Sequence, residues 1–388
     1  MSASKPQDAA PPTVPERARA LCARFAERGF TRIEPAILQP AELFVGLSGE
    51  DIRRRLYLVS DPSGVEYCLR PDFTIPVARA YLDEAAPKQA RYCYAGPAFR
   101  CRRAGAEPVQ RGEFHQAGIE IFGARNGEAA ELEMLELAFE SVLAAAPRGF
   151  ELRLGDPGLF AALLDCLDLP ESWRRRLRRH FWRHDVAEDL AQALAQPKGN
   201  ASREALAQAL AGLDRKAAAE LVEEVLALAG ILAVGGRSAE AIAGRFMERA
   251  GATAPAVSKR AIAVVRRYLA IEDKPLKAIK RVRALVKAEK LDLQDRVDGL
   301  ERRVAAIQAM LKKMGAAGAT FEAEFGRRLE YYTGLVFEIR DPEKPALGQI
   351  AGGGRYDRLL VDLGAARRIP AVGFAVYVDR LIEAGAAS

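Results

Sequence analysis

The sequence predicts an α+β fold in which a mixed or antiparallel sheet is interrupted by an all-helical insertion. Strand-like segments cluster near both ends of the 388-residue chain and do not alternate with helices. Between residues 169 and 318 the chain is rich in Ala, Leu, Arg, Lys and Glu at helical spacing. We therefore expect a disordered tail over 1–13, a core built from 14–168 and 319–388, and an insertion over 169–318.

The first part of the core contains both helix and strand patterns. Pro35 and Pro40 exclude a continuous helix between them, so residues 30–38 should be extended. Two short apolar runs flank the turn sequence DPSG at 61–64, which predicts a hairpin over 55–69. The remaining patterns predict helices over 14–28, 74–83 and 128–144, and strands over 89–100, 113–122 and 150–154.

The later part of the chain changes from helix to strand patterns near residue 320. Apolar residues from Val297 to Met314 recur at steps of three and four, which is typical of a helix that packs along one seam. The patterns that follow predict strands over 321–325, 335–340, 347–351 and 371–377.

Composition excludes several classes of protein. The chain has 49% hydrophobic and 28% charged residues, and neither a long apolar run nor a secretory signal is visible. Five scattered cysteines without a CxxC pair argue against a disulfide framework or a zinc site. We expect a cytoplasmic protein without membrane contact, metal or cofactor.

The net charge of +6 is a local feature. Residues 259–290 contain eleven Lys or Arg against three Asp or Glu, so the rest of the chain is slightly acidic. Such a stretch could bind nucleic acid, contact an acidic protein partner, or form a solvated helix face, and the last is the commonest case.

One predicted strand carries an unusual set of polar residues. In the strand over 113–122, Phe114, Gln116, Gly118 and Glu120 share one face, while His115 lies on the apolar opposite face. A glycine between two polar acceptors leaves room for a small cationic molecule against the backbone. A solvated sheet face remains the alternative.

Several segments together resemble histidyl-tRNA synthetase, a class II aminoacyl-tRNA synthetase. Residues 69–74 (LRPDFT) resemble that family's LRPE-G-T, and the strand pair over 96–123 resembles its motif 2. Residues 30–44 resemble motif 1, the dimer interface, and 371–380 resemble motif 3. The segments RRLEYYTG at 327–334 and AGGGRYD at 351–357 resemble its two histidine motifs.

This resemblance implies a class II synthetase-like antiparallel sheet flanked by helices, with a pocket for histidine. The pocket residues that it implies are Asp72, Gln116, Glu120, Arg327, Tyr331 and Tyr332. Carboxylate and amide oxygens would accept from the α-ammonium and imidazole N–H groups, and an arginine would pair with the carboxylate. By the same resemblance, Arg100 and Arg380 mark the nucleotide site.

The sequence departs from the synthetase pattern where ATP and tRNA would bind. Tyr377 stands where motif 3 has a glycine, Phe73 replaces the glycine of LRPE-G-T, and the motif 2 arginines before Phe114 are missing. The nucleotide site is therefore expected to be vestigial. The chain also ends eight residues after Arg380, so we expect no anticodon-binding domain.

A synthetase-like core with a histidine pocket, altered ATP motifs and no anticodon-binding domain resembles a paralogous family, the regulatory subunits of ATP phosphoribosyltransferase. That resemblance implies a non-catalytic homodimer within a hetero-oligomer that contains a short catalytic subunit. It implies a role in the first step of histidine biosynthesis, with histidine as feedback ligand and without tRNA. The alternative is a truncated synthetase-like enzyme that activates histidine with ATP.

Overall fold

The computed structural model describes residues 13–53, 55–84, 88–101, 112–144, 149–181, 213–228, 257–315, 318–326 and 331–385. These residues divide into two compact units. The first unit takes in residues 1–166, 181–183 and 264–388, and the second takes in 167–180 and 184–263. Except for Thr13, the expected tail over 1–13 lies outside the described residues.

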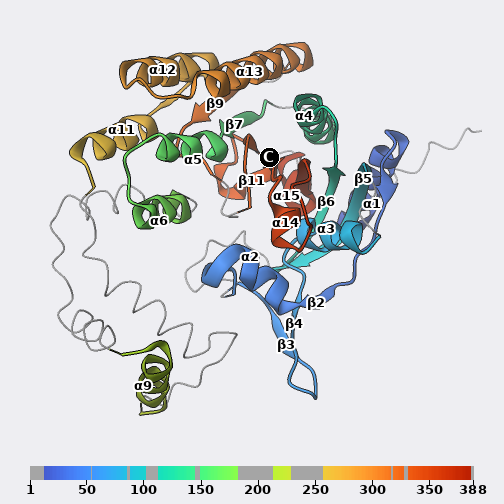
Figure 1. The fold of residues 1–388 in the computed structure, drawn as a ribbon. Coiled ribbons are helices and arrows are strands. Elements are labelled where there is room, and N and C mark those ends of the chain that lie inside the picture. Colours follow the sequence, from blue (N-terminus) through green and yellow to red (C-terminus); the bar gives the residue numbers. More distant parts are fainter. Residues whose placement is uncertain are drawn as a thin grey trace, which may run out of the picture. The chain divides into compact units, whose positions relative to one another are not determined.

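The first unit is built on a mixed sheet, as expected. Within the described residues this sheet has nine strands, in the order β1-β5-β6-β12-β11-β10-β7-β9-β8 (Figure 1). Its six central strands pair antiparallel, and only the β1–β5 and β7–β9 pairs are parallel. The strands are β1 (Thr31–Arg32), β5 (Ala90–Phe99), β6 (Glu113–Phe122), β7 (Glu151–Gly155), β8 (Glu272–Asp273), β9 (Gly318–Glu322), β10 (Val336–Arg340), β11 (Gln349–Arg355) and β12 (Ala371–Tyr377).

A separate three-stranded sheet contains the predicted hairpin. Strands β3 (Leu58–Ser60) and β4 (Glu66–Leu69) pair antiparallel, and β2 (Leu38–Pro40) pairs on the other edge of β4. The turn forms because Asp61 Oδ1 accepts hydrogen bonds from the backbone N–H groups of Ser63 and Val65, at 2.8 and 3.0 Å. Gly64 closes the turn at a φ of 85°, which glycine adopts without strain.

Different helices cover the two faces of the large sheet. On one face, Phe25 of α1 packs edge-on against Phe374, which lies beside Ile119 in the pairing of β6 and β12. On the other face, Tyr81 of α3 contacts Phe122, with ring centroids 4.8 Å apart. Because successive residues of β6 point to opposite faces, Gln116, Gly118 and Glu120 lie on the α3 side. The helices of this unit are α1 (Val14–Glu27), α2 (Ala41–Arg53), α3 (Thr74–Asp83), α4 (Gly127–Leu143), α5 (Pro157–Asp165), α12 (Pro275–Ala288), α13 (Gln294–Met314), α14 (Leu359–Asp362) and α15 (Val378–Gly385), with a 3₁₀ turn, η1 (Pro345–Leu347).

The helical region divides differently from the expected range. Helices α12 and α13 pack against each other, and the seam predicted for α13 is buried from Val297 to Leu311 (Figure 1). Both helices belong to the first unit, whereas the second unit ends at residue 263. The second unit contains α6 (Glu171–Phe181), apart from its last residue, and α9 (Arg215–Leu228), and α11 (Lys259–Leu269) begins in it. Residues 182–212 and 229–256 of the expected insertion lie outside the described residues.

Local differences from the sequence prediction have simple causes. The strand expected over 321–325 is β9, which begins earlier, and the strand expected over 347–351 begins later and continues through Gly352, Gly353 and Gly354. Three successive glycines would favour a turn. They pair with β10 and β12, and the lack of a side chain lets these backbones come close: a Cβ at Gly353 would lie 2.1 Å from the carbonyl oxygen of Gly373 on β12. Helix α2 was not expected, since no clear apolar period marks it.

Candidate functional site: a buried carboxylate among tyrosines

The centre of the α3-side face is the carboxylate of Glu120. Its side chain is fully buried, the Tyr356 hydroxyl donates to Oε2, and the Tyr94 hydroxyl lies 3.5 Å from Oε1. Burial raises the pKa of Glu120 to about 8, and the nearby Asp72 charge adds to the shift. Hydrogen bonds from Tyr356 and Thr74 act in the opposite direction. The carboxyl group is therefore largely protonated at neutral pH.

Two glycines make room for this group. Glu120 on β6 lies opposite Gly373 on β12, and a Cβ at Gly373 would lie 1.6 Å from Glu120 Oε2. A Cβ at Gly118 would lie 2.5 Å from the Tyr94 hydroxyl oxygen. Side chains at these positions would displace the acid or the tyrosine, so the strand pair is shaped around the polar groups.

Gln116 and Asp72 lie in the same buried region. Gln116 is 2% exposed and Asp72 is 6% exposed. This burial removes the alternative of a solvated sheet face. Among the residues that the structure describes, no group donates a hydrogen bond to Oε1 of Gln116. A buried amide oxygen without a donor is costly, and a ligand N–H or ammonium group would satisfy it.

The two tyrosines of the RRLEYYTG segment, Tyr331 and Tyr332, pack onto this cluster. The rings of Tyr331 and Tyr332 are tilted, with centroids 4.8 Å apart, and Tyr331 meets Tyr356 edge-on at 5.6 Å. Through Tyr356 they adjoin Glu120, so Tyr331 and Tyr332 belong to the same cluster as the β6 residues. Arg327 lies outside the described residues.

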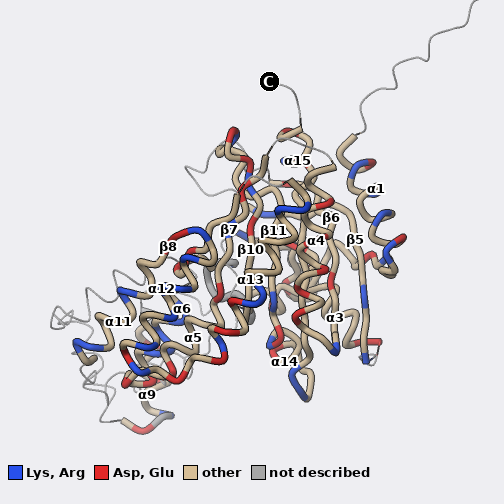
Figure 2. Tube along the Cα trace, turned by 90° about the horizontal axis from the view of Figure 1, so that it is seen from above, with Lys and Arg blue, Asp and Glu red and all other residues tan. Residues whose placement is uncertain are grey.

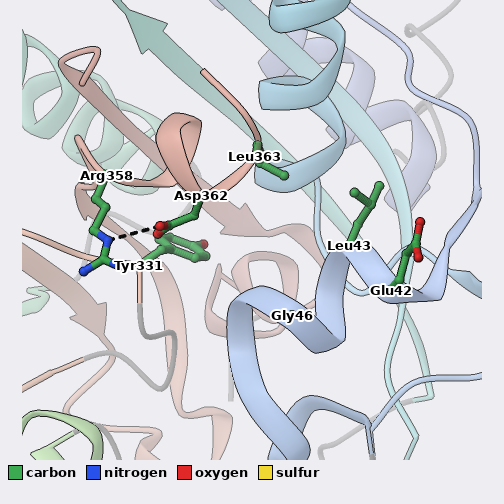
Figure 3. Close-up of a pocket in the computed structure, with 7 residues that line it drawn as sticks. All are labelled: Glu42, Leu43, Gly46, Tyr331, Arg358, Asp362 and Leu363. Atoms are coloured by element: carbon green, nitrogen blue, oxygen red, sulfur yellow. Dashed lines mark hydrogen bonds and ion pairs between the residues drawn. The ribbon is translucent and has the colours of Figure 1, made fainter. Parts of the chain in front are cut away.

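A cavity of about 610 Å³ opens beside Tyr331. Figure 3 shows Leu43 of α2 on one side of it, and Arg358 and Asp362 of the α14 turn on the other. Arg358 and Asp362 form an ion pair of 3.1 Å, so their charges offset each other. The cavity therefore gives a polar approach to Tyr331, whose ring contacts that of Tyr356.

An ionic network fixes β11, the strand before Tyr356. Arg355 donates to the carboxylate of Glu131 on α4, which is 1% exposed. Arg303 of α13 bridges Glu131 and Asp156, at 3.2 and 3.4 Å. Because Glu131 is buried, removal of either arginine would leave its carboxylate with less compensating positive charge. This network anchors the backbone that presents Tyr356 to Glu120.

The two arginines expected at the nucleotide site both contact Tyr377. Arg100 donates through Nη1 to the Tyr377 hydroxyl at 3.1 Å and through Nε to the Pro71 carbonyl oxygen at 2.8 Å. Arg380 lies with its guanidinium carbon 4.6 Å from the centre of the Tyr377 ring. The Phe114 ring completes the group, 5.5 Å from that of Tyr377. Both guanidinium groups thus contact the same phenol side chain.

The sequence prediction missed Tyr94 and Tyr356 as site residues. Tyr356 lay within the quoted AGGGRYD segment but received no role, and its hydroxyl is the closest partner of Glu120. Tyr94 could have been found by alternation along its strand, since it pairs with Gly118 in the β5–β6 register. His115 is half-buried, and its backbone N–H donates to Asp379 Oδ2 at 2.7 Å.

The part of the chain that the structure describes contains neither a cluster of metal ligands nor a helix that could span a membrane. No three His, Cys, Asp or Glu side chains there are grouped to hold a metal ion. No helix among those residues has the length and apolarity to cross a bilayer.

Comparison with known proteins gives the family. The histidyl-tRNA synthetase family profile matches residues 5–243 and 248–381. An ATP phosphoribosyltransferase regulatory subunit from Brucella anthropi is 39% identical over 356 residues, which cover 90% of this chain and 92% of the relative. The chain belongs to this family of regulatory subunits. The protein of the same name from Brucella ovis is 40% identical with the same coverage.

Two solved structures share the fold. A Bacillus halodurans protein described as an ATP phosphoribosyltransferase regulatory subunit/histidyl-tRNA synthetase superposes with a TM-score of 0.64 at 22% identity, covering 99% of this chain and 83% of that one. A histidine–tRNA ligase subunit from Alicyclobacillus acidocaldarius gives 0.56 at 24% identity, covering 99% and 97%. These matches confirm the class II synthetase-like fold, and the names of the curated relatives agree with a non-catalytic, regulatory role.

Proposed function

We propose that this chain is the regulatory subunit of an ATP phosphoribosyltransferase and that it binds histidine in the Glu120 pocket. In this proposal it acts in the cytoplasm with a short catalytic subunit, in the first step of histidine biosynthesis. It has no aminoacylation activity of its own. The observation that carries the ligand assignment is the buried set of Glu120, Gln116 and Tyr356, which offers acceptors to a small polar cation.

The chemistry of the pocket suits a ligand that brings its own positive charge. Glu120 holds its proton in the free chain because burial makes the carboxylate costly. An ammonium or imidazolium group would compensate that cost, and Glu120 would then release its proton. Gln116 Oε1 would accept a second N–H of the ligand.

The surroundings of Tyr377 support a regulatory role over adenylate chemistry. In synthetases a motif 3 glycine leaves space beside the nucleotide, whereas here the phenol side chain of Tyr377 contacts both Arg100 and Arg380. Arg100 is also held by the Pro71 carbonyl. Both arginines are thus engaged with the protein itself, which leaves them poorly placed for a triphosphate.

An exposed apolar surface supports the proposed homodimer. Six large apolar side chains on or beside the three-stranded sheet are each 38–48% exposed: Ile37, Leu38, Tyr57, Leu58, Val59 and Val65. Residues 30–44, which resemble the dimer-forming motif 1, supply two of them. A cluster of this kind marks a protein contact, and we assign it to a second copy of this chain.

The deciding experiment is calorimetric titration of the purified chain with L-histidine. We expect a single binding event in the wild type and its loss in the Gln116→Leu variant, which keeps the volume but removes the acceptor. The Glu133→Gln variant is the matched control, because Glu133 pairs with Arg91 at 2.6 Å, away from the pocket residues. Unchanged affinity in Gln116→Leu would place the histidine site elsewhere.

A reconstitution assay tests the assembly. The chain should restore phosphoribosyl transfer to an inactive short catalytic subunit, and histidine should then inhibit that activity. Histidine-dependent exchange of pyrophosphate into ATP by the chain alone would instead establish the synthetase-like alternative, in spite of Tyr377.

A further inference from the structure

A second cavity, distinct from the Glu120 pocket, carries an excess of positive charge. It has a volume of about 470 Å³ and lies between the last turn of α3, the residue after β6, and the loop from α14 to β12. Three cationic residues line it, Lys88, Arg367 and Arg368, and none of its lining residues is acidic. A volume of this size is typical of small-molecule sites, which span roughly 300–1,000 Å³.

The three cations lack carboxylate partners within the described residues. None of them takes part in an ion pair there, and residues 85–87, next to Lys88 in the chain, are Ala, Ala and Pro. Nearby acids are engaged elsewhere. Asp83 pairs with Arg79 at 3.3 Å, and Glu84 accepts from the Tyr92 hydroxyl at 2.5 Å. The positive field of the cavity is therefore not neutralised by these neighbours.

Gly123 holds the walls of the cavity together. Its backbone N–H donates to the Pro370 carbonyl at 2.7 Å, which ties the loop of Arg367 and Arg368 to the end of β6. Its φ is 71°, and a Cβ there would lie 2.1 Å from the Lys88 carbonyl oxygen. Only glycine fits this close approach. Gly123 therefore holds Lys88 near the loop that carries Arg367 and Arg368.

The floor of the cavity is apolar. Tyr81 is 1% exposed and packs on Phe122, and Ile369 is 8% exposed. Burial raises the pKa of Tyr81, so its hydroxyl stays neutral. The cavity thus combines a cationic rim with an apolar wall, which suits a ligand with one strongly anionic group and one ring or chain.

We propose that this cavity binds a small phosphate-bearing ligand between Lys88, Arg367 and Arg368, with the rest of the ligand against Tyr81 and Ile369. Guanidinium groups bind phosphate oxygens through paired N–H donors, and a lysine adds a mobile point charge. The proposal is independent of histidine binding and of the catalytic partner.

The test is calorimetric titration of the full chain with inorganic pyrophosphate, AMP and adenosine. The two phosphate-bearing probes should bind, and adenosine should not. The double variant Arg367→Gln/Arg368→Gln should weaken their binding at least tenfold. Tighter binding of AMP than of pyrophosphate would identify a nucleotide-like ligand, and equal binding would identify recognition of phosphate alone.

A charge-matched variant keeps the test specific. Helix α12 carries several Lys and Arg residues (Figure 2). Lys277→Gln/Lys280→Gln removes the same charge from two exposed positions of this helix, and it should leave both dissociation constants within twofold of the wild type. All four positions are exposed, so thermal unfolding should match the wild type in both variants. The proposal is overturned if neither phosphate probe binds, if the arginine variant binds as the wild type does, or if both variants lose affinity equally. Glu120→Gln should leave pyrophosphate binding intact, which separates this site from the histidine pocket.

Discussion

Replacing Glu120 by glutamine should remove a pH dependence from the stability of the protein. In the folded chain, burial raises the pKa of Glu120 from its ordinary value of 4.5 to about 8. Between these two values the unfolded chain has lost the proton and the folded chain keeps it. The folded state therefore binds more protons, so the free energy of unfolding falls as the pH rises through this window.

The size of the effect follows from the width of the window. One proton difference lowers the free energy of unfolding by about 1.4 kcal/mol per pH unit, so the whole window corresponds to roughly 5 kcal/mol. Glutamine has nearly the same shape and keeps an oxygen for the Tyr356 hydroxyl, but it has no proton to lose. The variant should therefore gain stability over the wild type as the pH rises from 5 to 8.

The assay is urea unfolding of both proteins at half-unit steps between pH 5 and 9. Glu133→Gln is the control, because its Arg91 partner lowers the pKa of Glu133, and the stability that this pair adds is lost only as the pH falls below about 4.5. Its difference from the wild type should therefore stay constant over the tested range. Parallel profiles for wild type and Glu120→Gln would refute the proposed protonation of the buried acid.

Three further outcomes test the packing and the surfaces. Gly373→Ala should abolish histidine binding and lower the thermal midpoint, because its methyl group would meet the buried carboxylate at 1.6 Å. Gly318→Ala on β9 should do neither, because a Cβ there meets open space. Arg355→Gln should cost about 3–5 kcal/mol in denaturant unfolding, because it leaves a buried carboxylate poorly paired, whereas the exposed Arg302→Gln should cost less than about 1 kcal/mol. Leu58→Asp should convert the proposed dimer to a monomer in light scattering; a persistent dimer would move the interface away from the three-stranded sheet.

Much of the first unit was predictable because its signals are local. The alternation of β6 assigned Gln116 and Glu120 to one face, and the DPSG turn fixed the hairpin between β3 and β4. The three-and-four spacing of α13 identified its buried seam from Val297 to Leu311. Each of these patterns is local, so a short stretch of sequence contains all the residues that determine the element.

The features that the sequence missed depend on contacts between distant segments. Tyr356 meets Glu120 across 236 positions of the chain, and the Arg303–Glu131 pair joins α13 to α4 across 172. Helices α12 and α13 resemble the insertion in composition, yet they belong to the first unit by contact. The amino-acid composition of a segment does not show which other segments it packs against.

By itself, the sequence determined the synthetase-like core, the polar face of β6 and the replacement of a motif 3 glycine by Tyr377. Only the tertiary structure decided that this face is buried, that burial holds a proton on Glu120, and that Arg100 and Arg380 contact Tyr377. The physical reason is that residue type and spacing set which groups a strand presents. Desolvation and pairing, which set the charge of those groups, arise only when the strands and helices pack together.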